Sequence, residues 1–335
     1  MIDHRPAGLV SALTDDQLDR AAGVLLGQAC GDALGVPYES GPSLPAELRL
    51  EMSGGGLGHY RPGEWSDDTQ MALCVAQVAA GSDLTEAKAL DDVAQRFLDW
   101  LRGGATDVGN LTRVVLREAG RREGTAAERC REAARIYRWA YPDNAAGNGA
   151  LMRTGAVGLA HLHDRRATAA AACAVAELTH ADPLCGESCV LWSEAVRVAV
   201  VEGRLELRAG LDLLPEERRG RWRAALDEVA SQPAAQFVDN GFTVTALQAA
   251  WAAIRETASS TGERHVRAAL EAAVRIGHDT DTVAAIAGSL VGARWGASCV
   301  PQKWRAAVRG WPGLEADGLV RLGRDIASAG IAAND

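Results

Sequence analysis

Two short acidic segments carry most of the chemistry that this sequence could perform. The first acidic segment, residues 64–70, reads Glu-Trp-Ser-Asp-Asp-Thr-Gln, and the second acidic segment, residues 277–282, reads Gly-His-Asp-Thr-Asp-Thr. Carboxylate and hydroxyl oxygens are the ligands that hard divalent cations prefer. If the fold brings the two segments together, they can hold one or two Mg²⁺- or Mn²⁺-like ions. This pattern predicts a metal-dependent enzyme and favours a hydrolase.

Both acidic segments stand at the start of predicted helices. Ser66 is a natural helix N-cap, and Asp67 and Asp68 would fall in the first turn. Acids in that position also interact favourably with the helix dipole, so each segment alone could be purely structural. Neighbouring side chains diverge by about 100° on a helix, which is poor for an acid–base pair but good for surrounding a cation. Small residues after each segment would let the helices pack closely and bring their ends together: Ala72, Ala284, Ala285, Ala287 and Gly288.

The elements that must position these segments are almost all helical. A capping box at residues 14–17 starts the first helix, which Gly31 and Gly35 are expected to end or bend. Further helices are predicted at 67–80, 85–103, 111–119, 126–139, 167–178, 186–201, 242–257, 263–275, 282–295 and 318–329.

Strand signals are almost absent, and the acidic segments lie far apart in the sequence. A shared site therefore requires the two ends of the chain to pack together. This favours a single all-α domain over residues 1–335, with its core at about 14–297, although the length alone suggests two domains. The long loop, residues 40–65, is rich in glycine and proline and is predicted to be a functional loop or lid.

Composition narrows the possible partners. The 335 residues carry a formal net charge of −9, which argues against generic binding to nucleic acids or anionic membranes. We find neither an export signal nor a run of 18 apolar residues, so a cytoplasmic protein is expected. The seven scattered cysteines form no zinc pattern, and most of them are expected to be buried thiols in a reducing compartment.

Two further segments could bind a ligand. The glycine-rich loop, residues 147–153, reads Gly-Asn-Gly-Ala-Leu-Met-Arg at a predicted helix start. Its backbone N–H groups could bind phosphate and Arg153 could add charge, although, taken alone, such a segment is more often a simple turn. His180 follows Thr179; taken alone, such a histidine is more often a hydrogen-bonded or capping residue. No nucleophile elbow or Walker loop competes with the acidic segments.

Taken in order, these pieces resemble the ADP-ribosylglycohydrolase family. They are Gly-Asp-Ala-Leu-Gly at 31–35 with Glu39, the first acidic segment, the glycine-rich loop, Thr179-His180 and the second acidic segment. The resemblance spans about residues 18–297. It implies an orthogonal all-α bundle with a binuclear Mg²⁺ or Mn²⁺ centre at the bottom of a cleft.

The resemblance also implies roles for individual residues. The metal ligands would be Ser66, Asp67, Asp68, Asp279, Asp281 and Thr282. The substrate contacts would be Asn148, Gly149, Ala150, Met152, His180 and Gly277. Asp67 or Asp68 would handle the proton, and Glu39 would assist the reaction or gate the site.

The implied activity is hydrolysis of the bond between C1″ of ADP-ribose and an acceptor, through an oxocarbenium-like centre. ADP-ribose would be the product. Arginine is the first acceptor expected, because residues 31–35 and 148–153 look most like the nitrogenase-regulating branch. Serine, nucleic-acid or small-molecule acceptors stay open, as do a non-catalytic ADP-ribose-binding protein and a metal phosphohydrolase acting on nucleotides. The long loop and residues 203–240 match no family signature and could set acceptor specificity.

Overall fold

The computed structural model describes residues 12–332, and 69% of the chain is helical. Residues 1–11 and 333–335, which the single-domain prediction includes, lie outside the described part. The α-helices are α1 (Asp15–Gly35), α2 (Asp67–Ala79), α3 (Ala87–Arg102), α4 (Asn110–Ala119), α5 (Ala126–Ala140), α6 (Val157–Ala160), α7 (Arg165–Ala176), α8 (Pro183–Glu202), α9 (Glu216–Ser231), α10 (Thr243–Glu256), α11 (Glu263–Arg275), α12 (Thr280–Trp295), α13 (Gln302–Ala307) and α14 (Ala316–Ala332). Among the described residues, one two-stranded hairpin joins β1 (Arg309–Gly310) to β2 (Leu314–Glu315). The all-α prediction is confirmed.

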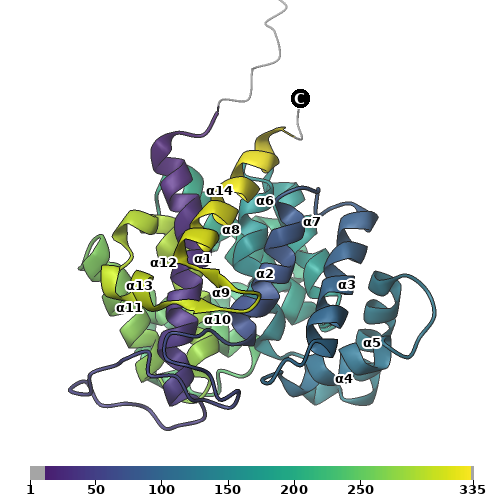
Figure 1. Ribbon diagram of the computed structural model, residues 1–335, viewed down its shortest axis with the longest axis horizontal. Coiled ribbons are helices and arrows are strands. Elements are labelled where there is room, and N and C mark those ends of the chain that lie inside the picture. Colours follow the sequence, from purple (N-terminus) through teal and green to yellow (C-terminus); the bar gives the residue numbers. More distant parts are fainter. Residues whose placement is uncertain (1–11, 333–335) are drawn as a thin grey trace, which may run out of the picture.

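Helix α1 runs from the top to the bottom of the view in Figure 1 and lies beside α14, which comes from the other end of the sequence. It starts at the predicted capping box, in which the backbone N–H of Gln17 donates to Thr14 Oγ1 at 3.2 Å. From Ala21 onward every residue of α1 is buried. It packs mainly against α12 and α14, which come from the far end of the sequence. This packing is what a single domain requires.

A line of glycines lets the backbones of α1 and α12 touch. Gly23, Gly27, Gly31 and Gly35 recur every four residues of α1 and therefore share one face. A Cβ added at Gly27 would lie 2.3 Å from the Gly288 carbonyl oxygen, and one added at Gly31 would lie 2.0 Å from the Ala284 carbonyl oxygen. Helix α1 therefore continues through Gly31 and ends at Gly35. Gly31 is needed for close packing, and it does not stop the helix.

The other predicted helices are present, and most of them have shifted ends. Helix α11 has the predicted bounds, whereas α8 begins three residues earlier than predicted, at Pro183. Proline is tolerated at the first turn, and the Asp182 carboxylate accepts a hydrogen bond from Leu184 N at 3.0 Å. Helix α9 was not predicted, because only Trp222, Leu226 and Val229 of its 16 residues are buried.

The long loop lacks α-helix and is tied to the second acidic segment. Ser40 N donates to His278 O, and His278 N donates to Gly41 O, both at 2.7 Å. All seven cysteines are free thiols, and five are buried, as predicted. Over the described residues, we find no helix with the length and apolar character needed to cross a membrane.

Candidate metal centre and active site

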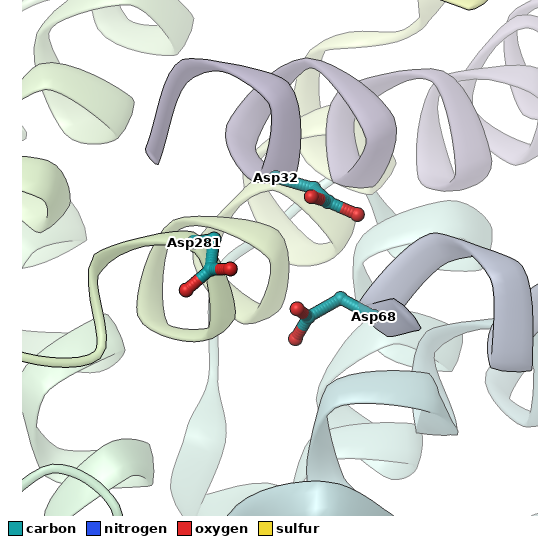
Figure 2. A group of neighbouring side chains, drawn as sticks. All are labelled: Asp32, Asp68 and Asp281. Carbon is teal, nitrogen blue, oxygen red and sulfur yellow. The ribbon is translucent and has the colours of Figure 1, made fainter. Parts of the chain in front are cut away.

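Three helices bring one carboxylate each to a common point. Asp68 lies in the first turn of α2, Asp281 in the first turn of α12, and Asp32 near the end of α1. One carboxylate oxygen from each residue lies within 4.8 Å of one oxygen of each of the other two. Figure 2 shows the three side chains and the helices that carry them. The two acidic segments therefore converge as predicted. Asp32 was not among the predicted site residues, although it lies in the Gly-Asp-Ala-Leu-Gly piece at 31–35 that contributed to the family resemblance.

Asp32 also caps α2 from outside that helix. Its carboxylate accepts hydrogen bonds from Ser66 N at 2.8 Å, from Thr69 N at 3.0 Å and from Thr69 Oγ1 at 2.6 Å. The expectation that the side chain of Ser66 caps α2 is wrong. Its hydroxyl donates instead to Asp68 Oδ2 at 2.9 Å. Ser66 thus orients a carboxylate of the candidate centre.

A second group of carboxylates lies beside the first. One oxygen each of Glu39, Asp107 and Asp281 also lie within 4.8 Å of one another, so Asp281 belongs to both groups. Two neighbouring cation positions could therefore share this carboxylate. Asp107 was also missed by the sequence analysis. The only signal for it was an acid in a short glycine-containing connection before α4.

The electrostatics of both groups favour bound cations. Burial, followed by repulsion from Asp32 and Asp67, raises the pKa of Asp68 well above its usual value. Burial, followed by repulsion from Asp68 and Asp279, raises the pKa of Asp281 in the same way. Burial and Asp107 raise the pKa of Glu39 to about 7. The donor set fits hard divalent cations because Asp68 Oδ1 and Glu39 Oε2 are buried without a hydrogen-bond partner among the described residues.

A cavity of about 640 Å³ opens above these acids. Nine of the predicted site residues line it: Glu39, Asp67, Asn148, Gly149, Met152, His180, Asp279, Asp281 and Thr282. Leu57 of the long loop and residues 106–113 complete much of the wall. The sequence analysis did not predict that residues 106–113 take part.

Asn148 connects the glycine-rich loop to the second acidic segment. Its Nδ2 donates to Asp279 Oδ2 at 2.7 Å and to the carbonyl oxygen of Asn240 at 2.9 Å. Asn240 in turn accepts a hydrogen bond from Asp279 N on its Oδ1 at 3.0 Å. The Asp279 carboxylate is thus held in place before α12 begins. Asn240 lies in the region that matched no sequence signature.

Four predicted site residues are not part of the cavity lining: Ser66, Asp68, Ala150 and Gly277. Ser66 and Asp68 are buried beside Asp32, and Ala150 is buried in the core. Gly277 has φ +84°, and a Cβ there would lie 2.6 Å from the backbone of Pro42 and Ser43. The structure gives Gly277 a packing role against the long loop.

Arg153 cannot supply charge to a ligand in the way the sequence suggested. Its side chain is fully buried, and Nη2 donates to Thr179 Oγ1 at 2.7 Å and to the Val175 carbonyl oxygen at 3.2 Å. The guanidinium also lies 4.5 Å from the centre of the Phe97 ring. The expectation is wrong because local sequence does not show that this part of the loop turns into the core.

Known proteins share this arrangement of sequence and fold. The profile of the ADP-ribosylglycohydrolase family matches residues 13–333. The chain is 31% identical over 300 residues to the ADP-ribosylarginine hydrolase Tri1 of Pseudomonas putida, covering 87% of this chain and 75% of that protein. It is 30% identical over 293 residues to the ADP-ribosyl-(dinitrogen reductase) glycohydrolase of Rhodospirillum rubrum, covering 85% and 89% of the two chains.

A solved structure described as an ADP-ribosylglycohydrolase-related protein complex superposes with a TM-score of 0.69 at 29% identity. The superposition covers 95% of this chain and 100% of the other. The family profile spans nearly all of the described residues, and the relatives are named as hydrolases of ADP-ribosyl bonds. The chain therefore belongs to the ADP-ribosylglycohydrolase family and is a glycosidase-type hydrolase.

Proposed function

We propose that this enzyme removes ADP-ribose from ADP-ribosylated arginine by hydrolysing the bond at C1″ of the distal ribose. The observation that carries the proposal is one cavity lined by the acids of both segments and by the glycine-rich loop. The names of the P. putida and R. rubrum relatives, which refer to ADP-ribosylarginine and to ADP-ribosylated dinitrogen reductase, support this class of substrate.

Two Mg²⁺ or Mn²⁺ ions are the proposed cofactors. The ligand set implied by the family resemblance is Ser66, Asp67, Asp68, Asp279, Asp281 and Thr282. Asp32, Glu39 and Asp107 add carboxylates next to this set. When bound, such ions supply Lewis-acid chemistry, by polarising ribose hydroxyls and lowering the pKa of water.

The side chains of the cavity can handle the proton and the developing charge. Asp67 lines the cavity, from which an acid could deliver a proton to the leaving guanidine, and burial and repulsion from Asp107 raise the pKa of its carboxyl group when no cation is bound to it. Glu39, with a pKa raised to about 7, can accept a proton from water on the same wall of the cavity. The surrounding carboxylates stabilise positive charge at an oxocarbenium-like C1″.

The charge of the cavity wall supports arginine as the acceptor. A guanidinium remains positively charged when it is linked to ribose, whereas a serine hydroxyl in the same position is neutral. Glu39 and Asp107 face the cavity and are only half-buried, so either could accept hydrogen bonds from a guanidinium.

An acceptor screen tests this proposal directly. We expect release of ADP-ribose from ADP-ribosyl-arginine in Mg²⁺ or Mn²⁺, and none in EDTA or with Asp67→Ala or Asp281→Ala. Asp16→Ala, an exposed acid in the first turn of α1, should keep full activity. Full activity in EDTA or in either cavity variant would contradict the mechanism.

Faster release from serine- or nucleic-acid-linked ADP-ribose would reject arginine, and tight binding of ADP-ribose without turnover of any acceptor would indicate a binding protein. Phosphate release from ADP-ribose would indicate a phosphohydrolase.

A further inference from the structure

His180 presents one ring nitrogen to the cavity and the other to a buried hydroxyl. The side chain is only 2% exposed, yet it lines the cavity. Its Nδ1 lies 2.7 Å from Thr179 Oγ1. None of the described residues forms a hydrogen bond with Nε2, which lies 3.2 Å from the position of a Cβ built on Gly149. A ring nitrogen that borders a cavity and has no hydrogen-bond partner among the described residues is available to a ligand.

Arg153 determines which atom of the Thr179–His180 pair is the donor. Arg153 Nη2 donates to Thr179 Oγ1 at 2.7 Å. A guanidinium can only donate, so the threonine oxygen is the acceptor in that bond. The hydroxyl has one proton of its own, and the remaining close partner is His180 Nδ1. The threonine oxygen could accept a second hydrogen bond, but its own proton would then have no acceptor among the described residues, because Nδ1 is the acceptor within reach. We therefore assign Nδ1 as the acceptor, which places the proton of the neutral ring on Nε2.

The surroundings of Arg153 fix the donor and acceptor in each of these hydrogen bonds. Its side chain is fully buried, and the contacts that hold it are the Val175 carbonyl oxygen, Met71 Sδ and the Phe97 ring. These groups leave the guanidinium charged and donating. Burial, followed by the positive charge of Arg153, lowers the pKa of His180 well below its usual value. The ring therefore stays neutral as well as in one tautomer.

We propose that Arg153 and Thr179 are positioning residues that lock His180 in the Nε2–H tautomer, so that the cavity offers a neutral hydrogen-bond donor to an oxygen of ADP-ribose. The identity of the ligand rests on the proposed function; the tautomer does not. Arg153 acts on the ligand indirectly, because it fixes the donor of two successive hydrogen bonds. Thr179 donates to His180, and His180 donates to the ligand. This assigns a role to a buried arginine for which the described residues provide no carboxylate partner.

The tautomer can be measured without any variant. In the ¹⁵N-histidine-labelled protein, we expect the NMR spectrum of His180 to show a protonated Nε2 and an unprotonated Nδ1 across neutral pH. A protonated Nδ1 or a doubly protonated ring would overturn the proposal. This readout does not depend on catalysis, so it remains decisive if the enzyme turns over no arginine-linked substrate.

A matched pair of variants at Thr179 tests whether the relay affects binding. Thr179→Val keeps the shape of the side chain but lacks the hydroxyl, whereas Thr179→Ser keeps the hydroxyl. We expect Thr179→Val to weaken ADP-ribose binding about tenfold in calorimetry, the effect of one hydrogen bond to a charged oxygen. Thr179→Ser should stay within about twofold of the wild type. Equal losses in both variants, or no loss in Thr179→Val, would contradict the relay.

A double-mutant cycle separates positioning from general damage to the fold. If Thr179 acts through His180, adding Thr179→Val to His180→Ala should weaken ADP-ribose binding no further. Additive losses would mean that Thr179 affects the cavity by another route. Circular dichroism and thermal unfolding confirm that each variant is folded. If the wild type does not bind ADP-ribose, the proposed function fails, while the NMR result still decides the tautomer.

Discussion

The carboxylate of Asp32 accepts two hydrogen bonds from Thr69, one from its backbone N–H at 3.0 Å and one from its hydroxyl at 2.6 Å. Asp32 belongs to α1 and Thr69 to the first turn of α2, so one helix caps another. The cap fixes the first acidic segment on the helix that also packs against α12. Helix α1 therefore positions both acidic segments, although it contains neither of them.

Replacing Asp32 should uncouple α2 from this support. Asp32→Ala leaves the Ser66 and Thr69 amides without their acceptor, which should cost about 2–4 kcal/mol of unfolding free energy. The measurement is urea unfolding in EDTA at about pH 5. At that pH most of the repulsion is absent, because burial raises the pKa of Asp32 to about 6. Asp16→Ala on the exposed start of α1 should cost no more than about 1 kcal/mol. Equal effects of the two substitutions would argue against the cap.

The stability of the metal-free protein should fall as the pH rises. Burial raises the pKa of Asp32 from 3.8 to about 6, and burial and Asp107 raise the pKa of Glu39 from 4.5 to about 7. Between about pH 4 and pH 7 the folded state therefore binds more protons than the unfolded chain, so ionisation destabilises the fold. Ionisation of Asp32 alone should lower the free energy of unfolding by on the order of 3 kcal/mol over this range. Thermal unfolding across this range in EDTA should show the decline.

Bound cations should remove most of that pH dependence, because they compensate the charge of the carboxylates. The same unfolding series in excess Mn²⁺ or Mg²⁺ should therefore be flatter and lie at higher temperature. A metal-free protein that becomes more stable towards neutral pH would show that the carboxylates are not held in mutual repulsion. Identical curves with and without the cations would argue against metal binding at these carboxylates.

The contact between α1 and α12 should not tolerate a single added methyl group. In Gly27→Ala the new Cβ would lie 2.3 Å from the Gly288 carbonyl oxygen, so the helices must separate. We expect a loss of more than about 3 kcal/mol in urea unfolding, together with weaker Mn²⁺ binding. Gly220→Ala in α9 is the matched control, since no atom lies within 4 Å of its new Cβ. That variant should be as stable as the wild type or more stable by up to about 1 kcal/mol. A stable Gly27→Ala protein would show that the helix pair can adjust.

Asp107 should be needed for turnover although no sequence motif marks it. It lines the cavity, and its carboxylate groups with those of Glu39 and Asp281. Asp107→Asn keeps its size and removes its charge, so we expect kcat/KM on ADP-ribosyl-arginine to fall at least about tenfold. Asp143→Asn, an exposed acid before the glycine-rich loop, is the control and should leave activity unchanged. Normal activity in Asp107→Asn would remove Asp107 from the site.

The residues that could be predicted from sequence are those whose chemistry is written into a short stretch of chain. Asp67 and Asp281 stand in compact acidic segments at helix starts, and the structure brings those segments together. Asp107 could not be found in this way, because it becomes part of the site only through packing between distant elements. Asp32 lies in the recognised piece at 31–35, but that piece alone does not show that α1 brings its carboxylate to Asp68 and Asp281. Arg153 shows the reverse error, since a charged residue at the end of a glycine-rich loop looked accessible but is buried.

The same distinction applies to the helices. Strongly periodic segments such as α11 were predicted with the correct ends, because an apolar stripe is a local property. Helix α9 has few buried positions and is held through specific contacts. Arg218 and Trp222 of this helix both donate hydrogen bonds to the buried carboxylate of Glu187 on α8. A helix attached in this way leaves little apolar pattern in the sequence.

The glycine line between α1 and α12 has a consequence for how this enzyme can diverge. Two helices whose backbones touch have no side chains between them that could repack, so the acids they carry keep their spacing when other parts of the protein change. The long loop and residues 106–113, by contrast, contribute to the cavity wall from segments outside this helix pair. Residues 106–113 include Asp107, so only the long loop is separate from the acids of the site. We therefore expect that exchanging the long loop between relatives changes which acceptor is released, while the acids on α1 and α12 keep their spacing.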